Sequence, residues 1–243
     1  MAGALRKSSG ATKLICAMTD YTASSYHEKR HPELLQSEEL LIAWSHFADD
    51  AYFSHVQRGQ SVLEYGGGLG NNLVAVSRRA KVSMVEPSSL GRATAGKHGI
   101  AAVERLDALT GCPCFDTVLC RHVLEHIDHP LLCLQELSRH LVTGGRLVIV
   151  VPVESNDLKP CANDLNHHLY CWNPQTLCNL LQKSGFELLE WHHEFYGARR
   201  KLLPVYRKLG GRAYAKCVRF VGKIFRFREL VVVARLSVDK SHS

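Results

Sequence analysis

Short apolar runs alternate with longer amphipathic segments along most of this chain. The runs have the length and composition of β-strands and lie at 61–65, 81–86, 101–104, 115–120, 146–152, 186–194 and 229–236. Helix-length segments separate them, at 72–79, 90–98, 130–141 and 173–185. This alternation predicts an α/β fold with a single doubly wound, seven-stranded, mostly parallel sheet.

Local signals at the ends of the expected helices support this interpretation. Pro130 can begin a helix because its missing N–H is not needed in the first turn, and Gly144-Gly145 can end that helix after Leu141. Asn173-Pro174 forms a second helix start, and Gly185 a second helix end. The run 146–152 is almost wholly apolar, as expected of a central strand buried on both faces.

The pattern also suggests how the chain is divided. Residues 1–20 are polar and unpatterned and are expected to form a flexible tail, whereas apolar positions at helical spacing predict N-terminal helices, a candidate lid, within 21–56. The core is expected at 57–198 and 229–238, interrupted by a basic helical insert at 199–228.

Composition narrows the class of protein. The chain has 243 residues, 46% of them hydrophobic, and no apolar run of about 18 residues that could span a membrane. It has nine cysteines, an odd number, and no export signal, which favours reduced thiols in a cytoplasmic protein over a disulfide framework.

A glycine-rich turn follows the first expected strand. Glu64, Gly66, Gly68 and Gly70 have the spacing E-x-G-x-G-x-G, which differs from both the dinucleotide fingerprint G-x-G-x-x-G and the phosphate loop G-x-x-x-x-G-K-[ST]. Glu86, at the end of the second strand, stands where α/β sheets place a carboxylate that binds both ribose hydroxyls. Together they predict a nucleoside pocket without a pyrophosphate grip, which argues against an NAD oxidoreductase.

Several motifs follow in a recognisable order. They are E-x-G-x-G-x-G, Val85-Glu-Pro87, Leu106-Asp-Ala108, Phe115-Asp-Thr-Val118, Val123-Leu-Glu-His126 and Leu141-Val-Thr-Gly-Gly-Arg-Leu147. As a set, over residues 60 to 152, they resemble the class I S-adenosylmethionine-dependent methyltransferases, whose fold is Rossmann-like.

The resemblance implies a site for S-adenosylmethionine. In this family Glu64 would orient the turn or meet the methionyl amine, and Glu86 would hold the ribose. Asp107 would face the adenine amino group, and Arg121 would lie at the mouth where the methyl group is transferred, although Arg121-His122 departs from the small or amide side chains of many relatives. The remaining positions implied to line the cofactor are Gly66, Gly68, Gly70 and Pro87.

Histidines are the candidates for catalysis. The segment 164–174 resembles the His-(three residues)-aromatic segment of a branch of small-molecule methyltransferases, in which the matching His168 lies beside the substrate. A hydroxyl acceptor must lose its proton, and histidine suits that role near neutral pH. His126 is the second candidate, ahead of His122 and His167. His122 and His126 also have two-histidine metal spacing, but the pattern contains no third ligand, so no metal is expected.

The insert carries all of the chain's net charge of +7, because it contains eleven Lys or Arg residues and no acidic one. Cationic residues on one helical face are Arg212, Lys216, Arg219, Lys223 and Arg226. Three interpretations remain open: a lid packed on the domain, a helix on an anionic membrane surface, or a nucleic-acid surface. The interspersed aliphatic residues resemble packing positions and count against stacking on single-stranded RNA.

These observations lead to one hypothesis with two alternatives. The expected activity is methyl transfer from S-adenosylmethionine to an oxygen of a small metabolite or of an anionic or lipid-linked glycan, in the cytoplasm and peripheral to the inner face of the membrane. A tRNA or other nucleic-acid methyltransferase is one alternative. A non-catalytic protein that binds the cofactor is the other. The acceptor and the oligomeric state are not encoded in any of these motifs.

Overall fold

The computed structural model describes residues 25–109, 114–155, 159, 164 and 166–237, so the expected tail at 1–20 lies outside the described residues. Its centre is a seven-stranded sheet with the order β3-β2-β1-β4-β5-β7-β6. The strands are β1 (Ser61–Tyr65), β2 (Lys81–Val85), β3 (Ala101–Val103), β4 (Phe115–Arg121), β5 (Leu141–Pro152), β6 (Phe186–Phe195) and β7 (Arg228–Leu236). The predicted doubly wound α/β sheet is confirmed.

Only β7 runs against the other strands. It pairs antiparallel with both β5 and β6, whereas β1 to β5 pair in parallel. Strand β6 therefore points in the same direction as β1, and the insert that follows β6 leaves from the carboxyl edge of the parallel strands. Ligands of open α/β sheets bind at this edge.

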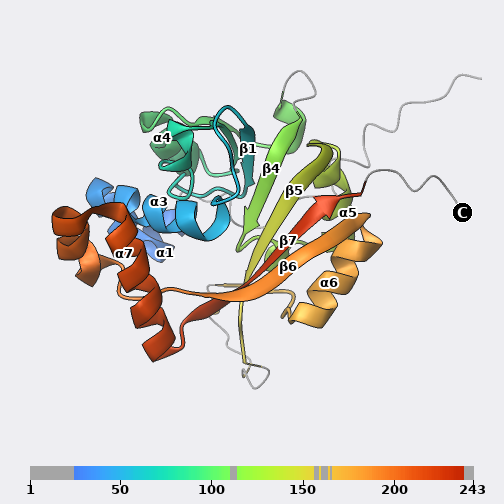
Figure 1. Ribbon diagram of the computed structural model, residues 1–243. Coiled ribbons are helices and arrows are strands. Elements are labelled where there is room, and N and C mark those ends of the chain that lie inside the picture. Colours follow the sequence, from blue (N-terminus) through green and yellow to red (C-terminus); the bar gives the residue numbers. More distant parts are fainter. Residues whose placement is uncertain (1–24, 110–113, 156–158, 160–163, 165, 238–243) are drawn as a thin grey trace, which may run out of the picture.

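Helices cover both faces of the sheet (Figure 1). The α-helices are α1 (Ser25–Arg30), α2 (Pro32–Gln36), α3 (Glu38–Tyr52), α4 (Ser89–Lys97), α5 (Pro130–Ser138), α6 (Pro174–Lys183) and α7 (Leu203–Phe225). Short 3₁₀ helices are η1 (Val76–Arg78), η2 (Leu106–Ala108), η3 (Leu124–His126) and η4 (Arg200–Leu202). Helices α3 and α7 pack on one face, and α5 and α6 pack on the other.

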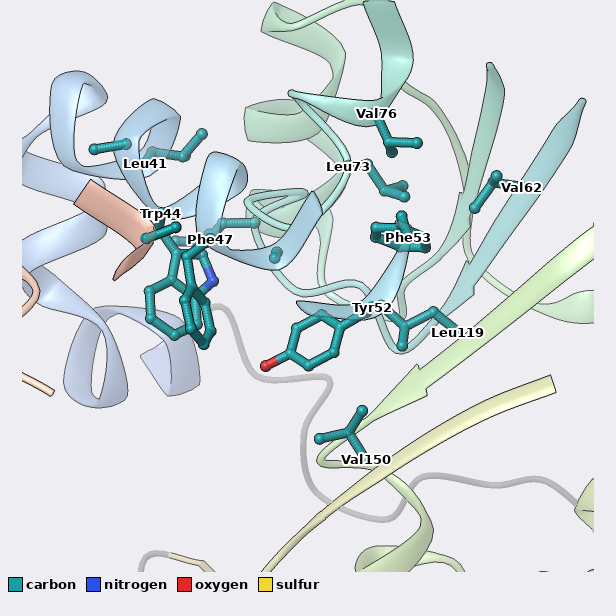
Figure 2. Close-up of a cluster of buried hydrophobic side chains, with 14 of the residues drawn as sticks. Leu41, Trp44, Phe47, Tyr52, Phe53, Val62, Leu73, Val76, Leu119 and Val150 are labelled. Atoms are coloured by element: carbon teal, nitrogen blue, oxygen red, sulfur yellow. The ribbon is translucent and has the colours of Figure 1, made fainter. Parts of the chain in front are cut away.

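Alternation along the strands separates the two hydrophobic cores. In β5, Val148 and Val150 join the core under α3 and α7, whereas Leu147, Ile149 and Val151 join the core under α5 and α6. Figure 2 shows the first core, in which the ring of Tyr52 at the end of α3 lies near Val150. Polar residues that share the register of the first core therefore project toward α3.

One expected helix and one expected helix end are wrong. The segment 72–79 forms turns and η1 instead of an α-helix; its β-branched residues are weak helix formers, and Asn72 turns its side chain inward to Glu64. Helix α5 ends at Ser138, and Gly144-Gly145 lies inside β5, where the pairing with β4 shifts register. Gly144 has a φ of 75°, so the glycine pair accommodates an irregularity in a strand.

The basic insert is helical, as expected, and is bent. Helix α7 is kinked at Gly210, whose φ of 77° is not helical. Its second half packs closely on the start of the loop after β6, because a Cβ on Gly222 would lie 2.4 Å from the backbone nitrogen of Tyr196. Tyr214 and Val218, on the side of α7 that faces the sheet, are fully buried. No helix among the described residues is both long and apolar enough to span a membrane.

Candidate active site

The loop after β1 turns sharply at the carboxyl edge of the sheet. Gly66, Gly68 and Gly70 have φ values of 74°, 57° and 76°, in the left-handed region that favours glycine. A Cβ on Gly66 would lie 2.3 Å from Cγ2 of Val123, just beyond the end of β4. The turn therefore needs glycine both for its conformation and for its close contact with the chain after β4.

Glu64 lies beneath this turn on the α3 face of the sheet. It is 1% exposed, and its Oε1 accepts a hydrogen bond of 2.5 Å from Nδ2 of Asn72. The Oδ1 of Asn72 in turn accepts one of 2.9 Å from Nε1 of Trp44, which holds the amide in place. Oε2 of Glu64 has no hydrogen-bond partner among the described residues, and burial raises the pKa of this carboxyl to about 8.

Glu86 closes the site from β2. Its Oε2 accepts a hydrogen bond of 2.8 Å from the backbone N–H of Gly68, and its Oε1 accepts one of 2.9 Å from that of Ser88. Nε2 of His27 on α1 lies 3.4 Å from the same Oε1, and both side chains are buried. The glycine turn and Glu86 are therefore joined directly, and α1 lies over them.

Pro87 and Asp107 lie farther out. Pro87 is half-buried, and its carbonyl accepts a hydrogen bond of 2.6 Å from Nη1 of Arg92. Asp107, in η2 beyond β3, is exposed and pairs with Arg105 through bonds of 3.0 and 2.5 Å. The structure thus brings Glu64, Glu86 and the glycines together, and it leaves Asp107 at the open side of the site.

A buried ionic network lies at the ends of β4 and β7. Nη2 of Arg121 donates to Oε2 of Glu229 at 2.9 Å, and Nε of Arg121 donates to the hydroxyl of Tyr52 at 3.1 Å. Tyr52 also hydrogen-bonds to Oε1 of Glu229, and Nε2 of His122 lies 2.9 Å from Oε2. The guanidinium carbon of Arg121 lies 5.4 Å from the ring centroid of Trp44. Arg121 is therefore held by an acid and by aromatic rings, within the wall of the site.

This network keeps Glu229 charged. Burial alone would raise the pKa of Glu229, but Arg121 and His122 outweigh burial and hold this pKa at about 2. Burial and the nearby Arg121 lower the pKa of His122. His122 also has a φ of 54°, which is unusual for a residue other than glycine.

His126 and His168 meet beside η3, where the backbone N–H of His126 donates to the carbonyl of Val123 at 2.9 Å. Their ring centroids lie 4.7 Å apart, although 42 positions separate them in the chain. Burial lowers the pKa of His126 to about 4, so its imidazole is neutral at pH 7. Nδ1 of His168 lies 2.7 Å from Oε1 of Glu154. His122 and His167 are not part of this pair, because His122 turns to Glu229 and His167 is exposed.

Several residues at the site were missed in the sequence. They are His27, Trp44, Tyr52, Asn72, Glu125, Glu154 and Glu229. The alternation of residues along β7 could have revealed one of them. Glu229 lies two and four positions before Val231 and Val233, so it points to the same face of the sheet, the face covered by α3. A carboxylate in that register requires a cation opposite, and Arg121 is in the matching register of β4.

The fold and these contacts define a class I, S-adenosylmethionine-dependent methyltransferase. The family model described as "Methyltransferase domain" matches residues 29–190, so the chain belongs to the methyltransferase domain family. No curated protein matches the chain.

Solved structures share the fold at low sequence identity. The 1,6-didemethyltoxoflavin-N1-methyltransferase of Burkholderia thailandensis, with bound 1,6-didemethyltoxoflavin and S-adenosylhomocysteine, is 19% identical with a TM-score of 0.61, over 98% of this chain and 94% of that one. A methyltransferase of Thermotoga maritima is 16% identical with a TM-score of 0.58, over 88% and 100%. The phosphoethanolamine N-methyltransferase 2 of Haemonchus contortus, with S-adenosylmethionine, is 15% identical with a TM-score of 0.55, over 89% and 60%.

The residues present fit the cofactor of this class. The unpartnered, buried Oε2 of Glu64 would lie 3.3 Å from a Cβ on Gly67, so it faces the glycine turn. Such an oxygen suits the methionyl ammonium, and the carboxylate of Glu86 at the edge of the turn suits ribose hydroxyls.

Removing the charge of Glu229 should destabilise the protein in a pH-dependent way. We expect Glu229→Gln to lower the free energy of unfolding by about 3 kcal/mol at pH 7, because Arg121 would remain buried without its acid. The pKa of Glu229 is lowered by folding, so the stability that it contributes is present above its ordinary pKa of 4.5 and is lost as pH falls toward 2. Urea unfolding from pH 7 to pH 3.5 should therefore show a difference between wild type and variant that shrinks below pH 4.5.

The matched control for this comparison is Glu187→Gln, which breaks an exposed ion pair with Arg235 on the same sheet. It should cost less than about 1 kcal/mol at every pH. Equal losses in the two variants would contradict a special role for the buried network.

Cofactor binding should release a proton from Glu64. With a pKa of about 8 this carboxyl is mostly protonated at pH 7 in the free protein, and a ligand ammonium beside it favours the ionised form. Calorimetric titration with S-adenosylhomocysteine in buffers of different ionisation enthalpy should then show release of roughly one proton. Glu64→Gln should remove this buffer dependence, whereas the exposed Glu104→Gln should retain it. An unchanged buffer dependence in Glu64→Gln would refute the assignment.

Proposed function

We propose that this protein transfers the methyl group of S-adenosylmethionine to an oxygen of an anionic small molecule or of a lipid-linked acceptor, with His126 and His168 at the acceptor oxygen. The observation that carries the choice of site is the meeting of these two histidines next to Val123, which itself touches the glycine turn. A methyl acceptor must lie close to and in line with the donor's methyl group.

S-adenosylmethionine supplies an electrophilic methyl group on a sulfonium. The histidine pair meets the other requirement of a hydroxyl acceptor, which is the loss of its proton as the new carbon–oxygen bond forms. His168 is better placed than His126 to take part, because Oε1 of Glu154 lies 2.7 Å from its Nδ1 and orients its ring. His126, which is neutral and buried, fixes the position of the His168 ring from the other side.

The basic helix supports an anionic or lipid-linked acceptor. Phe220, Ile224, Phe225 and Phe227 are each 59–65% exposed at the end of α7 and just beyond it. Exposed cations stand among them, and none of these has an ion pair within the described part of the chain: Lys216, Lys223, Arg226 and Arg228. Large apolar side chains beside unpaired cations are typical of a surface that binds an anionic membrane interface.

Two cations of the insert support a different interpretation, that of a lid packed on the domain. Arg219 pairs with Asp50 and Glu194, and Arg207 pairs with Glu39, so these two cations fasten α7 to the domain. The helix thus has a packed side and a free side, and the membrane proposal concerns only the free side.

A cavity of about 420 Å³ lies beside this surface and shares Phe225 and Phe227 with it. Its apolar lining is Val221, Phe225 and Phe227. Its charged lining is Arg199, Arg200 and Lys201 together with Glu33, which pairs with Arg199 at 2.9 Å, so cations are in excess. The guanidinium of Arg199 lies 5.0 Å from the ring of Trp44, which also contacts Arg121. An amphiphilic molecule with an anionic group would match both parts of this lining.

His168→Ala should reduce methyl transfer by at least about 100-fold, because general acid–base assistance contributes a factor of this order. S-adenosylhomocysteine should bind to the variant as it binds to wild type. The assay follows labelled methyl from S-adenosylmethionine into aqueous and solvent-extracted fractions of a cell extract, with the bond type of the product determined by mass spectrometry and NMR. Exposed His129→Ala is the control. A methylated nitrogen or nucleic acid as the main product would overturn the proposal.

The free side of α7 should bind vesicles that contain anionic lipid. We expect the triple variant Phe220→Ser, Ile224→Ser, Phe225→Ser to lose at least about tenfold in the partition coefficient measured by co-sedimentation, because three apolar side chains no longer enter the interface. The control Leu189→Ser, Trp191→Ser removes exposed apolar residues of β6 and should change nothing. Equal binding to neutral vesicles, or salt-sensitive binding of RNA without binding of vesicles, would contradict the membrane surface.

A further inference from the structure

Glu125 is a buried acid that the reaction described above does not use. It lies in η3 directly before His126, is 0% exposed, and has no hydrogen-bond partner for either carboxylate oxygen among the described residues. Its Oε1 lies 3.9 Å from Nε2 of His126, which is beyond hydrogen-bond distance. A buried carboxyl without a hydrogen-bond partner costs stability, so its retention needs an explanation. The chain around it is also unusual, because the N–H groups of Leu169 and Tyr170 both donate to its carbonyl, at 2.8 and 3.2 Å.

These backbone bonds place His168 against η3. Glu125, His126 and His168 each offer a ligand atom, and these three atoms lie within 4.8 Å of one another. Typical metal–ligand distances of about 2.0–2.2 Å put neighbouring ligand atoms roughly 3–3.5 Å apart, so a shift of about 1 Å would bring the groups to coordination distance. The spacing of His122 and His126 in the sequence was therefore not the relevant one, since the further ligands come from Glu125 and from a distant loop.

We propose that Glu125, His126 and His168 bind one divalent transition-metal ion, such as Mn²⁺, Fe²⁺ or Zn²⁺. Two imidazoles and one carboxylate suit such ions better than Mg²⁺ or Ca²⁺, which prefer all-oxygen sites. Three protein ligands leave open positions for water or for an oxygen of another molecule.

The contacts of both histidines support this proposal. Metal-binding histidines normally donate their second ring N–H to a carboxylate or carbonyl, which fixes the tautomer and the ring orientation. Nδ1 of His168 has Glu154 at 2.7 Å, which leaves Nε2 for the ion. His126 hydrogen-bonds to the backbone of His167. Both rings are therefore held as ligands of a metal are held.

The site lies where an ion could act on the acceptor. Val123 precedes Glu125 by two positions in the chain, and its side chain contacts the glycine turn at Gly66. If the proposed function is correct, on which this role rests, an acceptor oxygen would occupy an open position of the ion, and the ion would lower the pKa of its hydroxyl. The histidines would then assist the loss of the hydroxyl proton as ligands of the ion, and the proton would pass to water.

The test is a titration of chelator-treated, tag-free protein with Co²⁺, followed by absorption, and with Mn²⁺, followed by calorimetry. We expect one ion per chain, at least tenfold weaker binding in Glu125→Gln and in His168→Ala, and 10- to 100-fold weaker binding in Glu154→Gln, through the orientation of His168. The exposed His129→Ala should bind like wild type. Glu154 is only partly buried, so its variant remains informative if Glu125→Gln fails to fold.

Three results would overturn the metal site. They are no binding to folded wild-type protein at millimolar ion, equal binding to wild type and to the Glu125, His168 and Glu154 variants, or a thiolate-to-cobalt charge-transfer band, which would place the ion at cysteines. Binding of S-adenosylhomocysteine is measured on the same samples without metal. Loss of the cofactor site would appear there, and failure of the proposed function would appear in the bond type of the methylated product. Neither result depends on the ion titration, so the two failures are distinguishable.

Discussion

The buried pair of Arg121 and Glu229 is the interaction on which the site depends. Each would be very costly alone in the core, and together with Tyr52 they connect β4, β7 and the end of α3. The charge of Arg121 acts on both parts of the site, because it opposes the rise that burial causes in the pKa of Glu64 and in that of Glu125. Its hydrogen bonds fix the chain at the point where β4 ends and His122 adopts a left-handed conformation.

The cofactor side is built mostly from backbone and from two acids in contrasting states. Glu86 is satisfied by the N–H groups of Gly68 and Ser88, whereas Glu64 keeps one oxygen without a partner under the turn. This contrast fits a pocket in which the hydrogen bonds already fix Glu86, whereas Glu64 can still bind a cationic group of a ligand. Helix α1 completes the enclosure through His27, so the N-terminal helices are part of the site and not only a cover for the sheet.

The proposed acceptor side is built from segments that are distant in the chain. Glu125 and His126 come from η3, His168 and Glu154 come from the region after β5, and α7 comes from the insert after β6. Because β6 is parallel to β1, all of these segments meet at the carboxyl edge of the sheet. This edge explains how one protein can combine a cofactor turn, a cluster of possible metal ligands and a cationic, apolar surface within one face.

Local sequence determined the strands, the glycine turn and most helix ends, because alternation, capping residues and left-handed glycines act over a few positions. Asn173, for example, caps α6 with both bonds of a capping box, and Gly185 follows with a φ of 89°. The glycine pair at 144 and 145 misled because the same residue type ends helices and accommodates strand irregularities, and only pairing with β4 distinguishes the two. Tertiary structure alone decided which polar residues meet: Glu229 lies 108 positions from Arg121, and His168 lies 42 positions from His126. The order and direction of the strands across the sheet decide which side chains meet a buried charge or a metal-binding residue. A short stretch of sequence does not contain that order.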